Sequence, residues 1–458
     1  MSRRAVTAPM GTMYPALRVG PIIPVGPQQM TVALFGLAIY LFCVHSFKLP
    51  IASVGIGIGL IGVLSNPKAI TFPAPLLWMS VFLAWSALGL TISPYASEPG
   101  YGVVDFLKIL MIFFIALNSA KTSSQLAVMM GLWVIMFSLY PARGTYFNFL
   151  SGINTFGRYG WNFSFENFND LAAYTIFNLA LAGYLLAGRF PKWVKTCSLI
   201  ACAGFALLII ITQSRGAFIG LVVSFSFMLF RSRSRAKLIR VAGLAALGIA
   251  LMAPGAVWER FSRMKFLLST DTISEADSSA EQRWVLLQIA STIAREHLAT
   301  GVGLGAYSEA HGVYAEERQE WQIGRGNRDA HNMYVSLVAE TGLPGLGLFL
   351  AMLGSTLLRA LRTERALRAS FPIEAEQLRI LRFGLIAYLI AATFGSFHRV
   401  SFLYLYLAVL WSATSLFEEM MSSPLTAGSS FAPESLASAQ PARRGSLVRR
   451  YRSALPMR

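Results

Sequence analysis

The chain has 458 residues, of which 55% are hydrophobic and 13% are charged, and its formal net charge is +17. A soluble domain usually has about 25% charged residues, so this composition excludes an ordinary soluble enzyme and predicts an all-α, polytopic membrane protein. Basic residues that flank membrane segments account for the positive charge, and nucleic-acid binding is not needed to explain it.

Apolar runs recur along the chain, and each is close to the roughly 20 residues that a helix needs to cross a hydrocarbon core of about 30 Å. About twelve spans are predicted. They cover 29–47, 50–65, 73–93, 101–118, 124–141, 168–188, 194–213, 215–231, 237–253, 333–358, 380–397 and 400–417. Residues 1–28 precede the first span. Because further spans follow it, we expect the first span to be a membrane anchor and not a cleaved signal peptide.

Basic residues gather in the segments between alternate spans, where they predict the cytoplasmic side and contact with anionic lipid head groups. With twelve spans, residues 1–28 and the Ser-, Ala-, Pro- and Arg-rich tail at 418–458, which we expect to be disordered, fall on that side. The basic residues in the loops are Arg189, Lys192, Lys195, Arg231, Arg233, Arg235, Lys237, Arg240, Arg359, Arg362, Arg365, Arg368, Arg379 and Arg382.

Residues 254–332 form the one long polar segment, which we expect to be an external loop domain. It holds 11 of the 22 acidic residues and 8 basic residues, a balance that suits an external loop. Cys43, Cys197 and Cys202 all fall inside predicted spans, so no disulfide framework is expected.

The sequence lacks the motifs that mark several kinds of catalytic and binding sites. No stretch reads as a P-loop or as a Gly-x-Ser-x-Gly nucleophile elbow. The five histidines are far apart, and no pair has the spacing of a metal site. We therefore expect a metal-independent mechanism without a cofactor.

The turn between the spans 194–213 and 215–231 places Arg215 at the external membrane boundary. An arginine there is costly and runs against the positive-inside tendency, which favours a functional role over a merely snorkelling side chain. Its guanidinium can donate two parallel hydrogen bonds to phosphate oxygens. Ser214 and Gly216 are small and allow a ligand to approach the backbone closely.

Arg283 and Trp284 begin an amphipathic helix in the loop domain. Leu286, Ile289, Ala290 and Ile293 recur at helical spacing, as in a helix that lies on a membrane surface or one that positions Arg283 for a ligand. The Gly-x-Gly-x-Gly run at 301–305 follows no strand, so a tight turn is a better interpretation than a phosphate cradle.

His331 lies where the loop returns to the membrane, with Asn332 as a plausible helix cap. A neutral imidazole can accept a proton from a sugar hydroxyl, so His331 is the candidate catalytic base, and Arg325, Arg328 and Asp329 just before it would shift its pKa.

Two further external sets are weaker candidates. His398 and Arg399 lie between the last two spans and also face outward. The stretch 158–170 reads either as a sugar-contacting surface or as an interfacial aromatic belt. Its polar and aromatic residues are Arg158, Trp161, Asn162, Glu166, Asn167, Asn169 and Asp170.

Together these motifs resemble the O-antigen ligase/polymerase superfamily. The resemblance rests on Ser214-Arg215-Gly216-Ala217, on the Arg283-Trp284 helix that leads to Gly301-Val302-Gly303, and on His331-Asn332-Met333-Tyr334 running through Glu340-Thr341-Gly342 to Gly345. The motifs lie within about 150–350. One departure is Asn167-Phe168-Asn169, which stands where the family pattern has Asn-Pro-Asn.

The resemblance implies a fold like that of the glycosyltransferase C class in a bacterial inner membrane. It implies inverting transfer of a glycan from an undecaprenyl-pyrophosphate carrier at the periplasmic face, with Arg215 and Arg283 on the donor pyrophosphate and His331 as the base. The acceptor stays open: lipid A core in lipopolysaccharide biosynthesis, growing polysaccharide or exopolysaccharide, or a protein.

Two other classes also stay open. One is a transporter of a small anion such as bicarbonate, which would place ionisable residues near the bilayer midplane, where Asp105 and Lys108 are the main charges. The other is a non-catalytic assembly scaffold, which would not require Arg215, Arg283 and His331 together.

Overall fold

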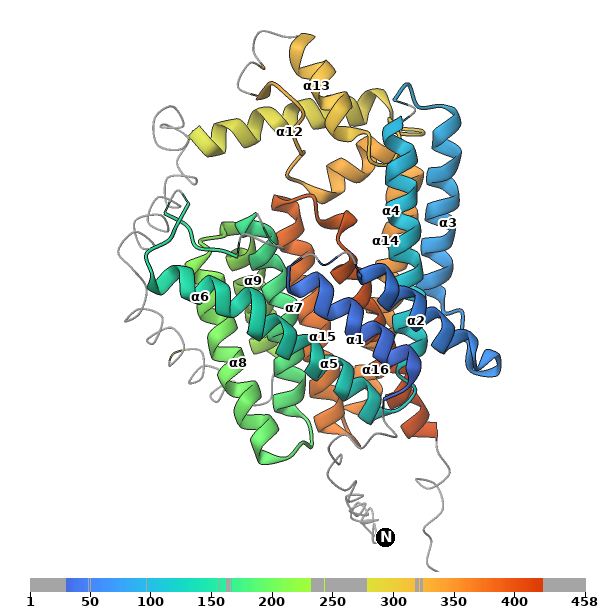
Figure 1. Cartoon of the computed structure of the whole chain (residues 1–458), viewed down its shortest axis with the longest axis vertical. Coiled ribbons are helices and arrows are strands. Elements are labelled where there is room, and N and C mark those ends of the chain that lie inside the picture. The colour runs from blue at the N-terminus through green and yellow to red at the C-terminus, as the bar shows by residue number, and fades with distance from the viewer. Residues whose placement is uncertain are drawn as a thin grey trace, which may run out of the picture.

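The computed structural model describes residues 30–47, 49, 51–95, 97–155, 157–161, 165, 167–231, 243, 278–317, 321 and 324–422. Within these ranges the chain is helical, apart from two isolated β-bridges that pair Thr155 with Arg158 and Trp161 with Phe165. The expected all-α membrane class is therefore confirmed (Figure 1).

The helices of the first half are α1 (Val32–His45), α2 (Ala52–Leu64), η2 (Pro67–Ala69), α3 (Ala74–Leu88), η3 (Gly89–Thr91), α4 (Ser97–Ser119), α5 (Ser123–Phe137), η4 (Ser138–Ala142), α6 (Arg143–Leu150), α7 (Phe168–Ala187), α8 (Lys192–Ile211) and α9 (Arg215–Arg231). Those of the second half are α12 (Ser278–Glu296), α13 (Tyr307–Glu317), α14 (Met333–Leu367), α15 (Pro372–Ala391), η7 (Ala392–Phe394), η8 (Phe397–Arg399) and α16 (Ser401–Ser422).

Eight helical segments of the described chain are long and apolar enough to cross a membrane. The apolar helices Val32–His45, Ala52–Leu64 and Arg215–Ser226 are shorter, and α1 and α2 extend only about 20 Å at roughly 1.5 Å per residue. Every predicted span except 237–253 coincides with one of these helices. The span 237–253, apart from residue 243, and most of the tail at 418–458 lie outside the described residues, so twelve crossings remain a prediction.

The boundaries differ most in the second half of the chain. α14 continues to Leu367, beyond the predicted end at 358, and α15 begins at Pro372 instead of at 380. Each extension is polar and charged, which is why hydropathy alone did not include it.

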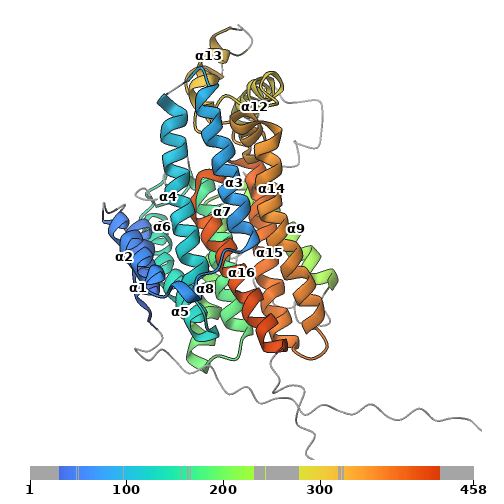
Figure 2. The same cartoon turned by 90° about the vertical axis from the view of Figure 1, so that its right-hand side faces the viewer.

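The bundle has a cap at one end. Figures 1 and 2 show α12 above α14 and level with the upper ends of α3 and α4, and α13 beyond them, while the α7–α8 and α14–α15 turns lie at the opposite end. We define the cap as residues 278–317, 321 and 324–341. It is the described part of the predicted loop domain together with the first turns of α14.

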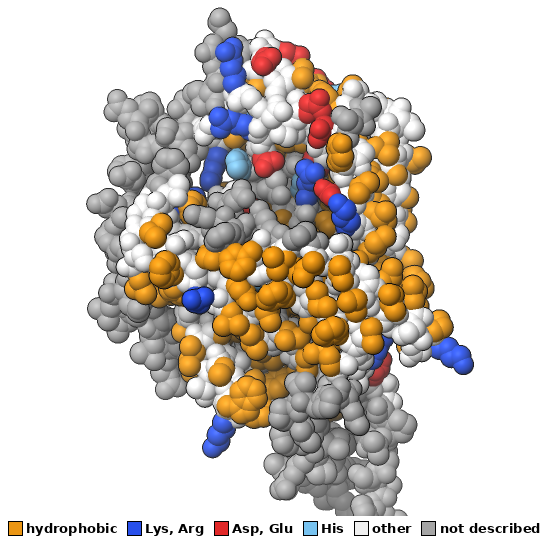
Figure 3. Space-filling view, in the orientation of Figure 1, with side chains coloured by type: hydrophobic (Ala, Val, Ile, Leu, Met, Phe, Trp, Pro, Cys, Tyr) orange, Lys and Arg blue, Asp and Glu red, His pale blue; other side chains and the backbone are white. Residues whose placement is uncertain are grey.

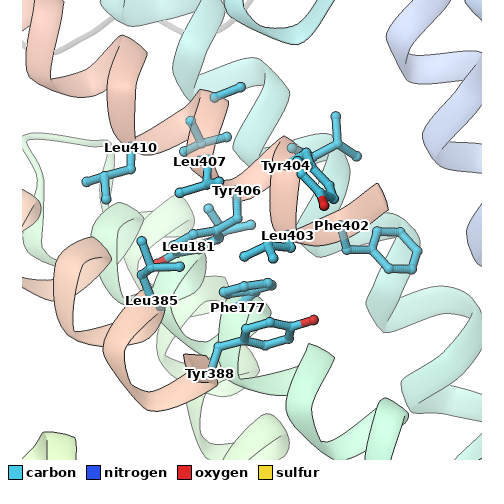
Figure 4. Packing of buried hydrophobic residues seen from close by; sticks show 14 of the residues in the cluster. Phe177, Leu181, Leu385, Tyr388, Phe402, Leu403, Tyr404, Tyr406, Leu407 and Leu410 are labelled. Carbon is cyan, nitrogen blue, oxygen red and sulfur yellow. The ribbon is translucent and has the colours of Figure 1, made fainter. Parts of the chain in front are cut away.

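Stacked aromatic rings form the centre of the bundle. Phe177 of α7 lies between Tyr388 of α15 and Tyr406 of α16, and its ring centroid is 4.1 Å from each of theirs (Figure 4). The Tyr406 hydroxyl donates to the carbonyl of Leu381 at 2.8 Å, so the buried polar atom is satisfied. α7, α15 and α16 thus pack together around this aromatic stack below the cap.

Three of the arginines expected at the lipid head groups instead meet inside the protein. The buried carboxylate of Glu364 pairs with Arg368 at 2.7 Å, Arg379 at 3.2 Å and Arg382 at 2.5 Å. A buried carboxylate needs such partners, and the cluster joins α14 to α15 at the end of the bundle opposite the cap.

Candidate functional site

The apolar face of α12 packs inside the cap and does not lie on a membrane surface. Ile289, Ala290 and Ile293 are fully buried, and they share a core with Val302, Tyr307 of α13 and Ala339 of α14. The predicted amphipathic helix is confirmed, and the partners of its apolar face are α13 and α14. Its polar side therefore carries Arg283 on a well-supported element.

The glycine-rich run packs against the first turns of α14 within the cap. The N–H groups of Val302 and Gly303 donate to the carbonyls of Ala339 and Glu340 at 2.8 and 3.0 Å. Gly303 has a φ of +109°, and a Cβ there would lie 2.5 Å from the side chain of Pro99. Two backbone N–H groups of this run already donate to carbonyls of α14, so they are not free to bind a phosphate. This agrees with a structural turn and not with a phosphate cradle.

His331 is held in an unusual backbone conformation at the edge of the cap. Its φ is +48°, and of the described residues other than glycine only Gln213 shares a positive φ. The Asn332 side chain then accepts from the N–H groups of Tyr334 and Val335 at 3.0 and 3.2 Å, which confirms the predicted cap of α14. Strained backbone of this kind is common at functional sites, because it fixes a side chain in one direction.

Arg283 and His331 lie close enough for their charges to interact, although one is on α12 and the other precedes α14. Burial lowers the pKa of His331, the positive charges of Arg283 and Arg328 lower it further, and Asp329 opposes them. The half-buried imidazole is therefore neutral at neutral pH, as a proton acceptor must be.

Arg215 begins α9 after a tight turn. The turn contains Gln213 with φ +54°, and the buried Ser214 precedes the half-buried Arg215. A Cβ on Gly216 would lie 2.8 Å from Phe394 of η7, so the absence of a side chain lets α9 approach that helix.

The stretch 157–169 supports this turn from the side. Arg158 donates from Nε to the carbonyl of Thr212 and from Nη2 to Oδ1 of Asn169, both at 2.9 Å. Gln213 donates to the carbonyl of Gly157 at 2.8 Å, and Asn167 caps α7. These polar side chains make contacts within the protein, so the stretch acts first as a support. Asn162 and Glu166 lie outside the described residues.

Contacts between distant segments bring the candidate residues around one region. Asp170 at the start of α7 lies within electrostatic range of Asp329 in the cap. The Tyr334 hydroxyl donates to the carbonyl of Leu389 at 2.9 Å, and both α9 and α14 contact η7. Figure 3 shows charged side chains of both signs and a histidine around a hollow between the cap and the apolar band of the bundle.

His398 and Arg399 occupy the junction between cap and bundle. His398 is 1% exposed, and its Nε2 lies 3.1 Å from a carboxylate oxygen of Glu340. Arg399 is exposed, and its Nη2 lies 3.3 Å from where a Cβ of Gly305 would be. This placement suits a supporting role for His398 better than direct contact with an acceptor.

The sequence analysis assigned no role to Glu340, although a signal was present. An acid within the apolar run that follows Asn332 is costly unless it is paired, so its position alone indicates a buried partner. The described part of the chain contains no group of three or more His, Cys, Asp or Glu side chains that could hold a metal ion.

No curated protein matches the chain. Residues 199–350 match the family model described as O-antigen ligase. The match spans the α8–α9 turn with Arg215, α12 with Arg283 and the start of α14 with His331. The predicted resemblance is thus confirmed over residues 199–350, which are similar to the O-antigen ligase family.

Proposed function

We propose that the protein transfers a glycan from an undecaprenyl-pyrophosphate carrier to an acceptor hydroxyl at the periplasmic face of a bacterial inner membrane. The family match supports glycan ligase or polymerase chemistry in general. The observation that carries the proposal is the position of His331 at the edge of the cap, where a backbone with positive φ holds it half-buried within electrostatic range of Arg283.

In this proposal Arg215 and Arg283 bind the donor pyrophosphate. Each guanidinium can donate two parallel hydrogen bonds to phosphate oxygens, and its charge stabilises the negative charge that develops on the leaving group. Arg215 comes from the bundle and Arg283 from the cap, so the two would approach the pyrophosphate from different elements.

His331 would act as the general base. The acceptor hydroxyl gives its proton to the imidazole while its oxygen forms a bond to the anomeric carbon. The bond from that carbon to the pyrophosphate oxygen breaks, and undecaprenyl pyrophosphate leaves with the electron pair. Attack from the face opposite the leaving group inverts the anomeric centre. Protein groups supply each of these roles, so no metal or cofactor is needed.

The remaining candidates would support this arrangement. Ser214 and Gly216 shape the turn before α9, and Asn332 fixes the helix that follows His331. Arg328 contributes positive charge beside the imidazole, while His398 and Arg399 lie where the cap meets the bundle.

Transport of a small anion has less support. Asp105 and Lys108 of α4 pair with each other at 2.9 Å, and both side chains are more than half exposed. The two charges offset each other locally, so they do not form a binding site for an anion.

The decisive experiment compares two activities of the purified protein. Transfer of a radiolabelled glycan from a lipid carrier to lipid A core, to a carrier-linked repeat and to a protein acceptor is measured with and without EDTA. Uptake of labelled bicarbonate into proteoliposomes is measured in parallel. Transfer that survives EDTA and is lost in His331→Ala supports the proposal, whereas uptake without transfer contradicts it.

A further inference from the structure

An apolar groove lies on the bundle, outside the cap. The groove of about 490 Å³ runs between α5 and α8, within the roughly 300–1,000 Å³ range of small-ligand sites. Its walls are apolar or carry small hydroxyl and thiol side chains, and Leu185 and Phe190 are among the apolar ones. None of the candidate residues for glycan transfer lines it.

The groove begins at the membrane end that the sequence predicts to be cytoplasmic. Ser124 in the first turn of α5 and Trp193 and Val194 in the first turn of α8 line its mouth. From there it follows α5 to Leu139, a distance of about 22 Å at roughly 1.5 Å per residue. This exceeds the depth of one leaflet, about half of a 30 Å core, and fits an inclined chain.

Two cations flank this mouth. Lys192 and Lys195 lie on the first turn of α8 beside Trp193 and Val194, and neither makes an ion pair with a described residue. Arg189 nearby lies 3.6 Å from a carboxylate oxygen of Glu374. The mouth therefore has positive charge available, while the groove behind it is apolar.

We propose that this groove binds an acyl chain of an anionic glycerophospholipid from the inner leaflet, with the head-group phosphate at Lys192 and Lys195. An apolar groove that opens at a pair of lysines matches one lipid chain attached to a negative head group. The proposal does not depend on glycan transfer.

The position of the lysines favours this lipid over the tail of a polyprenyl carrier. α8 has 20 residues, so Lys192 lies about 30 Å along the helix from the turn that leads to Arg215. A phosphate at the lysines is thus separate from a pyrophosphate at Arg215 and belongs to the opposite leaflet.

Filling the groove provides the first test. A Cβ added to Gly131 of α5, which lines the groove, meets no atom within 4 Å, so Gly131→Leu places its side chain in the open space. Gly354→Leu is the matched control, because Gly354 on α14 is also half-buried in a membrane helix with no atom within 4 Å of an added Cβ. Native mass spectrometry of the purified full chain measures retained phosphatidylglycerol. We expect retention to fall in Gly131→Leu and to stay at the wild-type level in Gly354→Leu.

Reversing the charge at the mouth provides the second test. Lys192→Glu with Lys195→Glu should weaken phosphatidylglycerol binding by about tenfold or more, since each basic residue near an anionic lipid contributes to its binding. Lys68→Glu with Arg362→Glu is the control, because both residues are exposed, lie on the predicted cytoplasmic side and do not line the groove. This control should bind phosphatidylglycerol as the wild type does.

A third test uses the unmodified protein. Cys197 is exposed and lines the groove, whereas Cys43 is buried. Added phosphatidylglycerol should slow the reaction of Cys197 with an apolar maleimide in detergent, and phosphatidylcholine with the same acyl chains should not.

Three results would overturn the proposal. They are equal retention of the two phospholipids, unchanged retention in Gly131→Leu, and protection of Cys197 by undecaprenyl phosphate but not by phosphatidylglycerol. The last would assign the groove to a polyprenyl chain.

Discussion

A carboxylate oxygen of Glu340 lies 3.1 Å from Nε2 of His398, and both side chains are at least 98% buried. Glu340 is on α14 just before the non-helical Gly342, and His398 is in the turn before α16. The backbone of Gly305 also forms a hydrogen bond with Glu340. One carboxylate of the cap thus contacts both the glycine run and the turn before α16.

Removing either partner should destabilise the protein. Glu340→Ala or His398→Ala leaves a buried polar group without its hydrogen-bond partner, which typically costs roughly 1–3 kcal/mol. Thermal unfolding in detergent measures the loss, and the double variant should lose less than the sum of the two. Strictly additive losses would mean that the two side chains do not interact.

His331→Ala should reduce glycan transfer by about 10²–10⁴-fold, the usual effect of removing a general base. Donor binding should be largely kept, because the arginines hold the pyrophosphate. Radiolabel transfer and carrier-lipid binding are measured on the same preparation. If His331→Ala keeps full transfer while His398→Ala abolishes it with the fold intact, the base is His398.

The pH profile should report the lowered pKa of His331. Transfer requires the neutral imidazole, so activity is present above this pKa and is lost as pH falls through it. Burial and the nearby arginines place the midpoint below the ordinary value of about 6.5. Arg328→Gln should raise the midpoint of kcat/KM, and Asp329→Asn should lower it. Shifts in the same direction for both variants would assign the profile to another group.

Arg215→Lys and Arg283→Lys should each lose most donor binding and transfer. Lysine keeps the positive charge but cannot donate two parallel hydrogen bonds to phosphate oxygens. Arg143→Lys is the control, because Arg143 is an exposed arginine at the start of α6. Near-parental activity in both test variants, with normal membrane insertion, would place pyrophosphate recognition elsewhere.

A reporter fused near Ser278 should be accessible from the periplasm, and one at the C-terminus from the cytoplasm. The distribution of basic residues motivates this expectation. Alkaline phosphatase fusions should be active at the first position and inactive at the second. The reverse pattern would place the cap and its candidate site in the cytoplasm.

Local patterns in the sequence predicted the elements that local physics determines. The helical spacing of Leu286, Ile289, Ala290 and Ile293 identified the buried face of α12. Residues three or four apart lie on the same face of an α-helix, so apolar residues at that spacing mark the face that is buried. Asn332 was recognisable as a cap since capping involves only the next three residues.

Contacts between distant segments were beyond such reasoning. Neither the Glu340–His398 pair nor the bond from Arg158 to Thr212 follows from any spacing, because packing of separate helices brings these residues together. The positive φ of Gln213 and of His331 could not be predicted from the sequence either. Residues other than glycine rarely adopt a positive φ unless the surrounding structure enforces it.

The cap and the bundle supply different parts of the candidate site. Arg283 and His331 share the cap's packing with α13 and the first turns of α14, whereas Arg215 begins a helix that packs against α15. A pyrophosphate bound by both arginines would bridge the cap and the bundle, which α14, the Glu340–His398 contact and the bond from Tyr334 to Leu389 also join. Donor binding would then stabilise the folded protein by about 2.7 kcal/mol when the free donor concentration is a hundred times Kd. The donor would thus hold the cap in place for as long as it remains bound.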